Sequence, residues 1–200
     1  MKAVHIGCQW WVATSGFMEP LAAHDIRVLV LYGQFVLRDV WCDAGDEGES
    51  FAAAQQDGVV GASTYQLTIR ALSPWAGLQL RLWSADPGPD SGTWDGWRQL
   101  ELHCPTGELS VDQITAGAAA EVTLPAGAGV YGVRVHWRDR ETAAEEVTRL
   151  YAERSNEPAD LLSAALREVD GTEKFLVDFW WQTPLPPADD DEDFYSDIWS

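Results

Sequence analysis

The sequence predicts an all-β protein, an antiparallel β-sandwich of about seven to nine strands with one or two helices inserted before the last strand. Three observations predict this fold. Residues 1–138 consist mainly of short runs in which apolar and polar side chains alternate, as in strands. Turns that contain Gly or Pro separate these runs. Residues 141–170, in contrast, carry apolar side chains at helical spacing.

The first long apolar run, residues 24–40, is apolar on both faces. It predicts a central strand buried on both sides, or a strand that bends near Gly33. Clearer alternation predicts strands over 63–72, 77–83, 97–104, 108–115, 120–125, 130–138 and 174–182. Residues 42–50 and 84–96 are predicted to be loops. The predicted inner faces include Val28, Val30, Tyr65, Leu67, Ile69, Leu78, Leu80, Leu82, Val133, Val135, Leu176 and Phe179.

Helical signals are confined to residues 141–170. Glu145 and Arg149 stand four residues apart, a spacing that brings them together on a helix. A second helix is predicted after Asn156 as its cap, with Gly171 as its stop. We therefore expect residues 1–182 to form one β-sandwich domain with a helical insertion at about 141–170, followed by a C-terminal tail at 183–200.

The charge of the chain limits its possible partners. It carries 32 Asp and Glu against 13 Lys and Arg, a formal net charge of −19. Direct binding to nucleic acid requires cations that replace phosphate counterions, and an anionic membrane surface would repel the chain for the same reason. A basic protein would be attracted over a long range. Solubility alone is an equally good explanation of the charge.

The tail joins this charge to aromatic side chains. Residues 183–200 hold six acidic residues and no basic one. Carboxylates that pair with Lys or Arg, together with aromatic anchors, are suited to a basic protein surface with an apolar pocket. Packing of the aromatic rings on the chain's own sandwich, or on a second copy in a homo-oligomer, remains the alternative. The predicted partner-binding residues are Asp189, Asp190, Asp191, Glu192, Asp193, Phe194, Tyr195 and Trp199.

Catalytic and cofactor motifs are not recognisable. A GxGxxG pattern begins at Gly127, but a predicted strand follows it where a dinucleotide site needs a helix. The histidines lack the spacing of metal ligands, so we expect no catalytic residues, cofactor or metal. The three cysteines form no CxxC, and the N-terminal segment lacks the apolar core of a signal peptide. These features predict a cytoplasmic, non-enzymatic binding protein.

A second interpretation uses the tryptophans, of which there are 11. Trp75, Trp94 and Trp97 lie in or beside predicted turns, where carbohydrate-binding sandwiches stack sugars on indole rings. Asp86, Asp90 and Asp95 would supply polar contacts. A carbohydrate- or small-ligand-binding sandwich is therefore an alternative function. A third is a structural component of a bacterial assembly, in which obligate contacts would cover aromatic surface.

Three segments resemble small bacterial β-sandwich proteins, of the kind found in actinobacteria. They are LYGQFVLRD (31–39), LPAGAGVYGVRVHWRDRE (124–141) and EKFLVDFWWQTP (173–184). More distantly, they are similar to the competence protein J family. That resemblance implies a sandwich fold and the inhibition of a nuclease by a non-catalytic inhibitor or immunity-type protein. It assigns no catalytic residues. With the charge, it predicts a basic partner such as a nuclease or a toxin.

Overall fold

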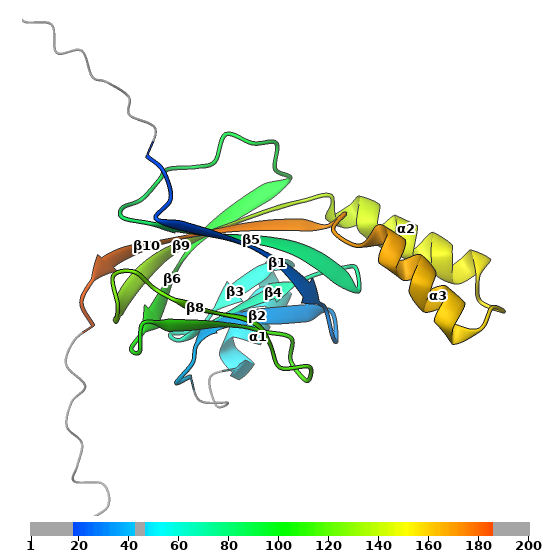
Figure 1. The fold of residues 1–200 in the computed structure, drawn as a ribbon, viewed down its shortest axis with the longest axis horizontal. Coiled ribbons are helices and arrows are strands. Elements are labelled where there is room, and N and C mark those ends of the chain that lie inside the picture. The colour runs from blue at the N-terminus through cyan, green and yellow to red at the C-terminus, as the bar shows by residue number, and fades with distance from the viewer. Residues whose placement is uncertain (1–17, 43–46, 186–200) are drawn as a thin grey trace, which may run out of the picture.

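The architecture is two five-stranded sheets that share one hydrophobic core (Figure 1). The structure is a computed structural model and describes residues 18–42 and 47–185. Sheet A contains, in spatial order, β1 (Ala22–Leu29), β5 (Trp75–Trp83), β10 (Lys174–Thr183), β9 (Gly129–Arg138) and β6 (Gly96–Cys104). Sheet B contains β3 (Val60–Ala62), β4 (Gln66–Arg70), β2 (Gln34–Asp39), β7 (Glu108–Asp112) and β8 (Ala118–Thr123). The helices are α1 (Glu47–Asp57), α2 (Arg140–Glu153), α3 (Ala159–Leu166) and the 3-10 turn η2 (Arg167–Val169).

The β-rich fold class is confirmed, but the described residues contain ten strands where the sequence predicted seven to nine. Part of the difference arises at residues 24–40, which form two strands in different sheets. Tyr32 and Gly33 have positive φ angles of 56° and 73° and make a tight turn. The Gln34 N–H then donates to the Leu31 carbonyl oxygen at 3.2 Å. As a result, β1 is an edge strand of sheet A, whereas β2 is central in sheet B.

Strand pairing is antiparallel throughout, except that β10 runs parallel to β5. This pairing places β10 in the middle of sheet A. Because side chains alternate between the faces of a strand, each strand of sheet A sends one set of residues into the core and the other set outward. Core residues of sheet A include Leu78, Leu80, Leu82, Val133, Val135, Phe175, Val177 and Phe179.

Two of the predicted core residues occupy other positions. Tyr65 is half-buried and makes edge contacts with the rings of Trp41 and His103. Leu176 is buried, but its neighbours Phe175 and Val177 face the core, so Leu176 lies on the outer face of sheet A. Its burial shows that part of this outer face is covered.

Helix α1 corrects the prediction of a loop over 42–50, because the helix begins at Glu47. The hydroxyl of Ser50 is buried and lies 2.8 Å from the hydroxyl of Thr68, and it accepts a hydrogen bond from Gln66 at 2.8 Å. Gly61 permits close contact here, since a Cβ atom at this position would lie 2.2 Å from the Ala54 nitrogen. Helix α1 therefore packs closely on β3 and β4.

Helices α2 and α3 project beyond the end of the sheets, and we call residues 140–169 the helical arm (Figure 1). The arm has a small core of its own, formed by Leu150, Ala165, Leu166 and Val169. At its base, Arg140 Nε donates to the buried carboxylate of Glu173 at 3.2 Å. The same carboxylate accepts the backbone N–H groups of Leu72 and Ser73, which ties the arm to the sheets.

Candidate functional site

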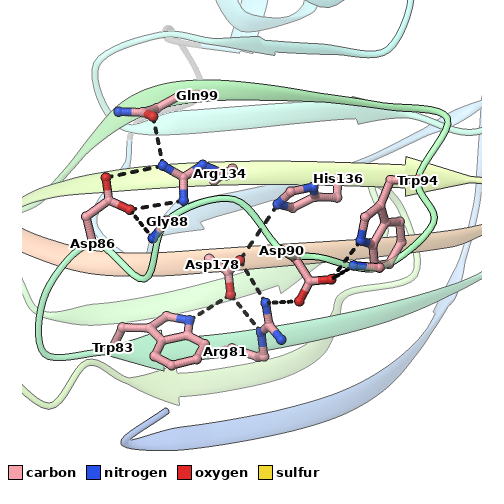
Figure 2. A network of polar contacts seen from close by, with 11 residues as sticks. Arg81, Trp83, Asp86, Gly88, Asp90, Trp94, Gln99, Arg134, His136 and Asp178 are labelled. Atoms are coloured by element: carbon pink, nitrogen blue, oxygen red, sulfur yellow. Dashed lines mark hydrogen bonds and ion pairs between the residues drawn. The ribbon is translucent and has the colours of Figure 1, made fainter. Parts of the chain in front are cut away.

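A row of charged side chains crosses the outer face of sheet A (Figure 2). Asp178 on β10 is in register with Arg81 on β5 and with Arg134 on β9, and Arg134 is in register with Gln99 on β6. The side chain of Asp178 is fully buried and that of Arg134 is 3% exposed. Buried charges are stable only when they are paired and hydrogen-bonded, so the partners of this row decide what it can do.

Asp178 is the centre of the row. Its Oδ1 accepts hydrogen bonds from Arg81 Nε and Trp83 Nε1, each at 2.7 Å. Its Oδ2 accepts a third hydrogen bond from Arg81 Nη2 at 3.0 Å. The geometry with Arg81 is that of a two-pronged carboxylate–guanidinium pair, which holds both side chains in a fixed orientation.

The loop of residues 84–95 closes over this row and places a carboxylate on each arginine (Figure 2). Asp86 lies 3.0 Å from Arg134, and Asp90 accepts from Arg81 Nη2 at 3.0 Å. Each aspartate also accepts a backbone N–H two residues further along, from Gly88 and Gly92 respectively. The Pro-, Gly- and Asp-rich composition of the segment favours such turns. We call the loop together with the row the loop clamp.

Both loop aspartates have a lowered pKa. Burial alone would raise the pKa of Asp90, but hydrogen bonds from Trp94 and Gly92 and the pair with Arg81 outweigh it. For Asp86, the effect of burial is likewise outweighed by Arg134 and by the Gly88 N–H. Both groups are therefore ionised at neutral pH, and the clamp is held by charge-assisted contacts.

His136 lies under the loop and is 1% exposed. Its ring centroid lies 5.5 Å from that of Trp94 and 6.4 Å from that of Trp97. Neither ring nitrogen has a hydrogen-bond partner in the described part of the chain, and Nε2 is 3.9 Å from Asp178 Oδ2. Burial lowers the pKa of His136 more than Asp178 and Asp90 raise it. The imidazole is therefore neutral at pH 7.

Tryptophan side chains surround the arginines. The indole of Trp180 lies against Gly132, where a Cβ atom would come within 2.2 Å of the ring. The guanidinium of Arg134 stands 5.0 Å from the Trp180 ring centroid and 5.8 Å from that of Trp97. Cations and indole faces at these distances attract one another. Trp180 and Trp83 are thus buried on the outer face, whereas Trp137 belongs to the core.

This arrangement has the properties of a structural clamp. An acid–base pair works through a hydrogen bond of about 2.6–3.2 Å, and the His136–Asp178 distance of 3.9 Å is longer. Asp178 already accepts three hydrogen bonds, so both of its oxygen atoms are engaged within the sheet. Among residues 18–42 and 47–185, no group of three or more His, Cys, Asp and Glu side chains is placed to hold a metal ion.

The structure separates the predicted tryptophan site into two places. Trp94 and Trp97 come together over His136, and Trp97 is 46% exposed. Trp75 lies at the start of β5, where the guanidinium of Arg27 stands 4.0 Å above its ring. Asp95 accepts the Asp139 N–H at 2.7 Å and so joins the loop to the start of the arm. The predicted partner-binding residues of the tail, Asp189–Asp193, Phe194, Tyr195 and Trp199, lie outside the described residues.

Sequence reasoning missed four members of the clamp. They are Arg134, His136 and Asp178, which are buried, and Arg81, whose side chain is 18% exposed. Alternation identified the outward face of each strand. It could not show that β5, β10 and β9 are neighbours, or that a loop would cover them. The available signal was an outward Arg or Asp in the centre of each of three strongly apolar strands.

Most of the basic side chains in the described part of the fold are in ion pairs, whereas many of the acidic side chains are not. Of the 12 Arg and Lys residues in the described part of the chain, nine form an ion pair with a carboxylate. Many exposed carboxylates have no Arg or Lys partner there. They are Glu19, Asp25, Glu49, Asp95, Glu101, Glu108, Glu121, Glu141, Glu145, Asp160 and Glu168. Folding therefore neutralises most cations internally and leaves the surface acidic.

Comparisons with known proteins leave the family of this chain open. No family model matches the sequence, and no curated protein is significantly similar to it. Two solved structures are distantly similar. One is ComJ, the inhibitor of the DNA-degrading activity of NucA, from Bacillus subtilis. The two sequences are 13% identical, the match covers 84% of this chain and 100% of ComJ, and the TM-score is 0.49. The other is crocagin biosynthetic gene J, with 14% identity, coverage of 81% and 99%, and a TM-score of 0.48. At these values, neither likeness carries an argument about function.

No helix among the described residues is long and apolar enough to cross a membrane.

Proposed function

We propose that this chain is a non-catalytic, cytoplasmic acidic binding protein that docks on the basic surface of another protein, such as a nuclease or a toxin, and blocks it. The observation that carries the proposal is the pairing of nine of 12 described cations within the fold. A surface from which most free cations have been removed steers basic partners toward it. Its carboxylates can then occupy the sites where the partner binds phosphate.

The tail is the proposed anchor. Asp189–Asp193 would pair with Lys and Arg of the partner, while Phe194, Tyr195 and Trp199 would enter an apolar pocket. The helical arm offers a second acidic surface, with unpaired Glu141, Glu145 and Asp160. Tyr151 and Leu161 on the arm are about half exposed, at 48% and 50%. Charge would set the rate and salt dependence of association, and the aromatic anchors would set its lifetime.

The test is affinity capture from a lysate of the source organism with three forms of the full chain. They are the wild type, a tail-neutral form in which Asp189–Asp193 become the matching amides, and a control in which Glu108, Glu121 and Glu168 become Gln. The control removes exposed charge elsewhere. Basic proteins that high salt releases, and that the tail-neutral form captures less than the control does, support the proposal. Captured proteins that are not predominantly basic, or capture that does not change with the salt concentration, would contradict it.

The carbohydrate alternative has one observation in its favour, which is the exposed indole of Trp97, whose ring packs against His136 as that of Trp94 does. Sugar stacking on Trp97 would change tryptophan emission, and a Trp97→Ala variant would lose that change. A glycan panel that leaves the emission of the wild-type chain unchanged would remove this alternative.

A further inference from the structure

A second row of residues crosses the outer face of sheet A near the base of the arm, and it contains three cations. Arg27 on β1 is in register with Gly77 on β5, Gly77 with Lys174 on β10, and Lys174 with Arg138 on β9. In each strand, a residue adjacent in sequence belongs to the core. Because side chains alternate between the two faces of a strand, all four of these residues are on the outer face. Gly77 leaves the position between Arg27 and Lys174 without a side chain.

A cavity of about 520 Å³ lies over this row. Its size is within the range of small-ligand sites. Three strand cations and two glycines line it together with two carboxylates, Asp25 on β1 and Asp170 in the segment after η2. The residues that matter here are Arg27, Gly77, Arg138, Asp170, Gly171 and Lys174.

The charges in the cavity are not balanced. Arg27 forms an ion pair with Asp170, and Asp25 accepts a hydrogen bond from Gln79 at 3.0 Å. Lys174 has no ion pair within the described residues. Arg138 has one long contact with Asp139, at 3.6 Å, and its buried Nε has no hydrogen-bond partner there.

The pairing of Lys174 with Arg138 is unfavourable in the absence of a ligand. Like charges directly opposite each other on antiparallel strands destabilise a sheet. Nine of the 12 described cations have a carboxylate partner, Arg27 and Arg138 among them, so Lys174 is the cation of this row that lacks one. A local conflict of this kind is expected at a binding site, where a ligand supplies the missing charge.

We propose that this cavity binds the oxyanion of a small molecule, a phosphate or carboxylate group, between Lys174, Arg138 and Arg27. The guanidinium groups supply planar pairs of N–H donors, and the Lys174 ammonium supplies a point charge. Gly77 gives the ligand access to the sheet surface. The site adjoins the loop clamp at Arg138, whose guanidinium lies 5.2 Å from the centroid of the Trp94 ring.

The test is a titration of the full, ¹⁵N-labelled chain with inorganic phosphate at constant ionic strength, followed by NMR. The amide signals of Gly77 and Gly171 report on the cavity. We expect saturable shifts centred on these signals, with affinity in the millimolar range. Lys174→Gln and Arg138→Gln should each weaken binding about tenfold. Gly77→Leu should abolish it while leaving every charge in place.

Arg167→Gln is the matched control, because it removes an exposed cation outside the cavity. It should leave the affinity unchanged. The tail-neutral form should bind phosphate as tightly as the wild type, or more tightly if the tail carboxylates compete for the same site. Shifts that do not saturate, shifts scattered over the surface, or equal weakening by Arg167→Gln and Lys174→Gln would overturn the proposal.

Discussion

Asp178 and Arg81 face each other on the parallel neighbours β10 and β5 and are joined by hydrogen bonds of 2.7 and 3.0 Å. Since Asp178 also accepts the Trp83 indole N–H, one buried carboxylate connects two strands and an aromatic side chain. The carboxylate thereby fixes the part of sheet A on which the loop of residues 84–95 rests.

Asp178→Asn should lower the free energy of unfolding by about 3 kcal/mol, because Arg81 loses the buried charge that compensates it. Urea unfolding followed by tryptophan emission measures this change. Glu121→Gln removes a carboxylate from the exposed surface of β8 and should leave the transition where it is. If the Asp178→Asn variant unfolds at the same urea concentration as the wild type, this carboxylate is not needed for the stability of the sheet.

Asp90→Ala should loosen the loop while the sheets remain folded. The substitution removes the acceptor of Arg81 and of the Trp94 indole, and we expect a local loss of about 1–2 kcal/mol. Limited proteolysis should cut within residues 84–95 faster than in the wild type. Ser91→Ala, an exposed change in the same loop, serves as the control. Equal cleavage of the two variants would contradict the clamp.

Acid should destabilise the protein through His136. Its folded pKa lies below the ordinary value of 6.5, so the unfolded chain takes up a proton first as the pH falls. Between that value and the lower folded pKa, the unfolded state binds more protons, and stability decreases with decreasing pH. His136→Phe removes the titrating group and should flatten this dependence. Above about pH 7.5 the two stability curves should run parallel, because the imidazole is neutral in both states. An unchanged slope in the variant would be evidence against a buried neutral imidazole.

Cys104 should be inert in the folded protein. Burial raises the pKa of its thiol far above the ordinary value, and the charge of Asp39 adds to this. The thiolate is the reactive form, so a thiol reagent at pH 8 should label Cys104 only after unfolding. A Cys8→Ser background and peptide mapping separate its reaction from those of the other cysteines. Rapid labelling of native Cys104 would contradict the burial.

The helical arm should melt independently of the sheets. Leu150→Ala creates a cavity in the arm's own small core, at a local cost of about 2–4 kcal/mol. Hydrogen exchange should become faster in α2 and α3 but not in β9 and β10. Leu161→Ala, at a position that is half exposed, should change little. Faster exchange throughout the sheets would mean that arm and body unfold together.

The sequence predicted the elements whose signal is local. Strands at 77–83, 97–104, 130–138 and 174–182 agree with β5, β6, β9 and β10 to within two residues, because their alternation is regular. Helix α1 was missed, since its start lies in a Gly-rich acidic stretch and its apolar residues are mostly alanine. The break at Gly33 was seen as a bend only. Whether a strand continues in the same sheet depends on distant pairing partners.

The site was predictable in part for the same reason. The sequence drew attention to four residues in or beside the turn-rich segment 84–96, which are Asp86, Asp90, Trp94 and Trp97. Their partners Arg81, Arg134 and Asp178 looked like ordinary outward residues of separate strands. The parallel pairing of β10 with β5 places Asp178 between the two arginines. A contact between residues so far apart along the chain has no local signature.

The most direct test of the central claim is the salt dependence of binding between the purified chain and a basic protein identified by capture. For an acidic surface on a basic partner, the affinity should fall steeply as salt rises, and the tail-neutral form should show both weaker binding and a smaller slope. An affinity that is independent of salt and equal for the two forms would contradict the account.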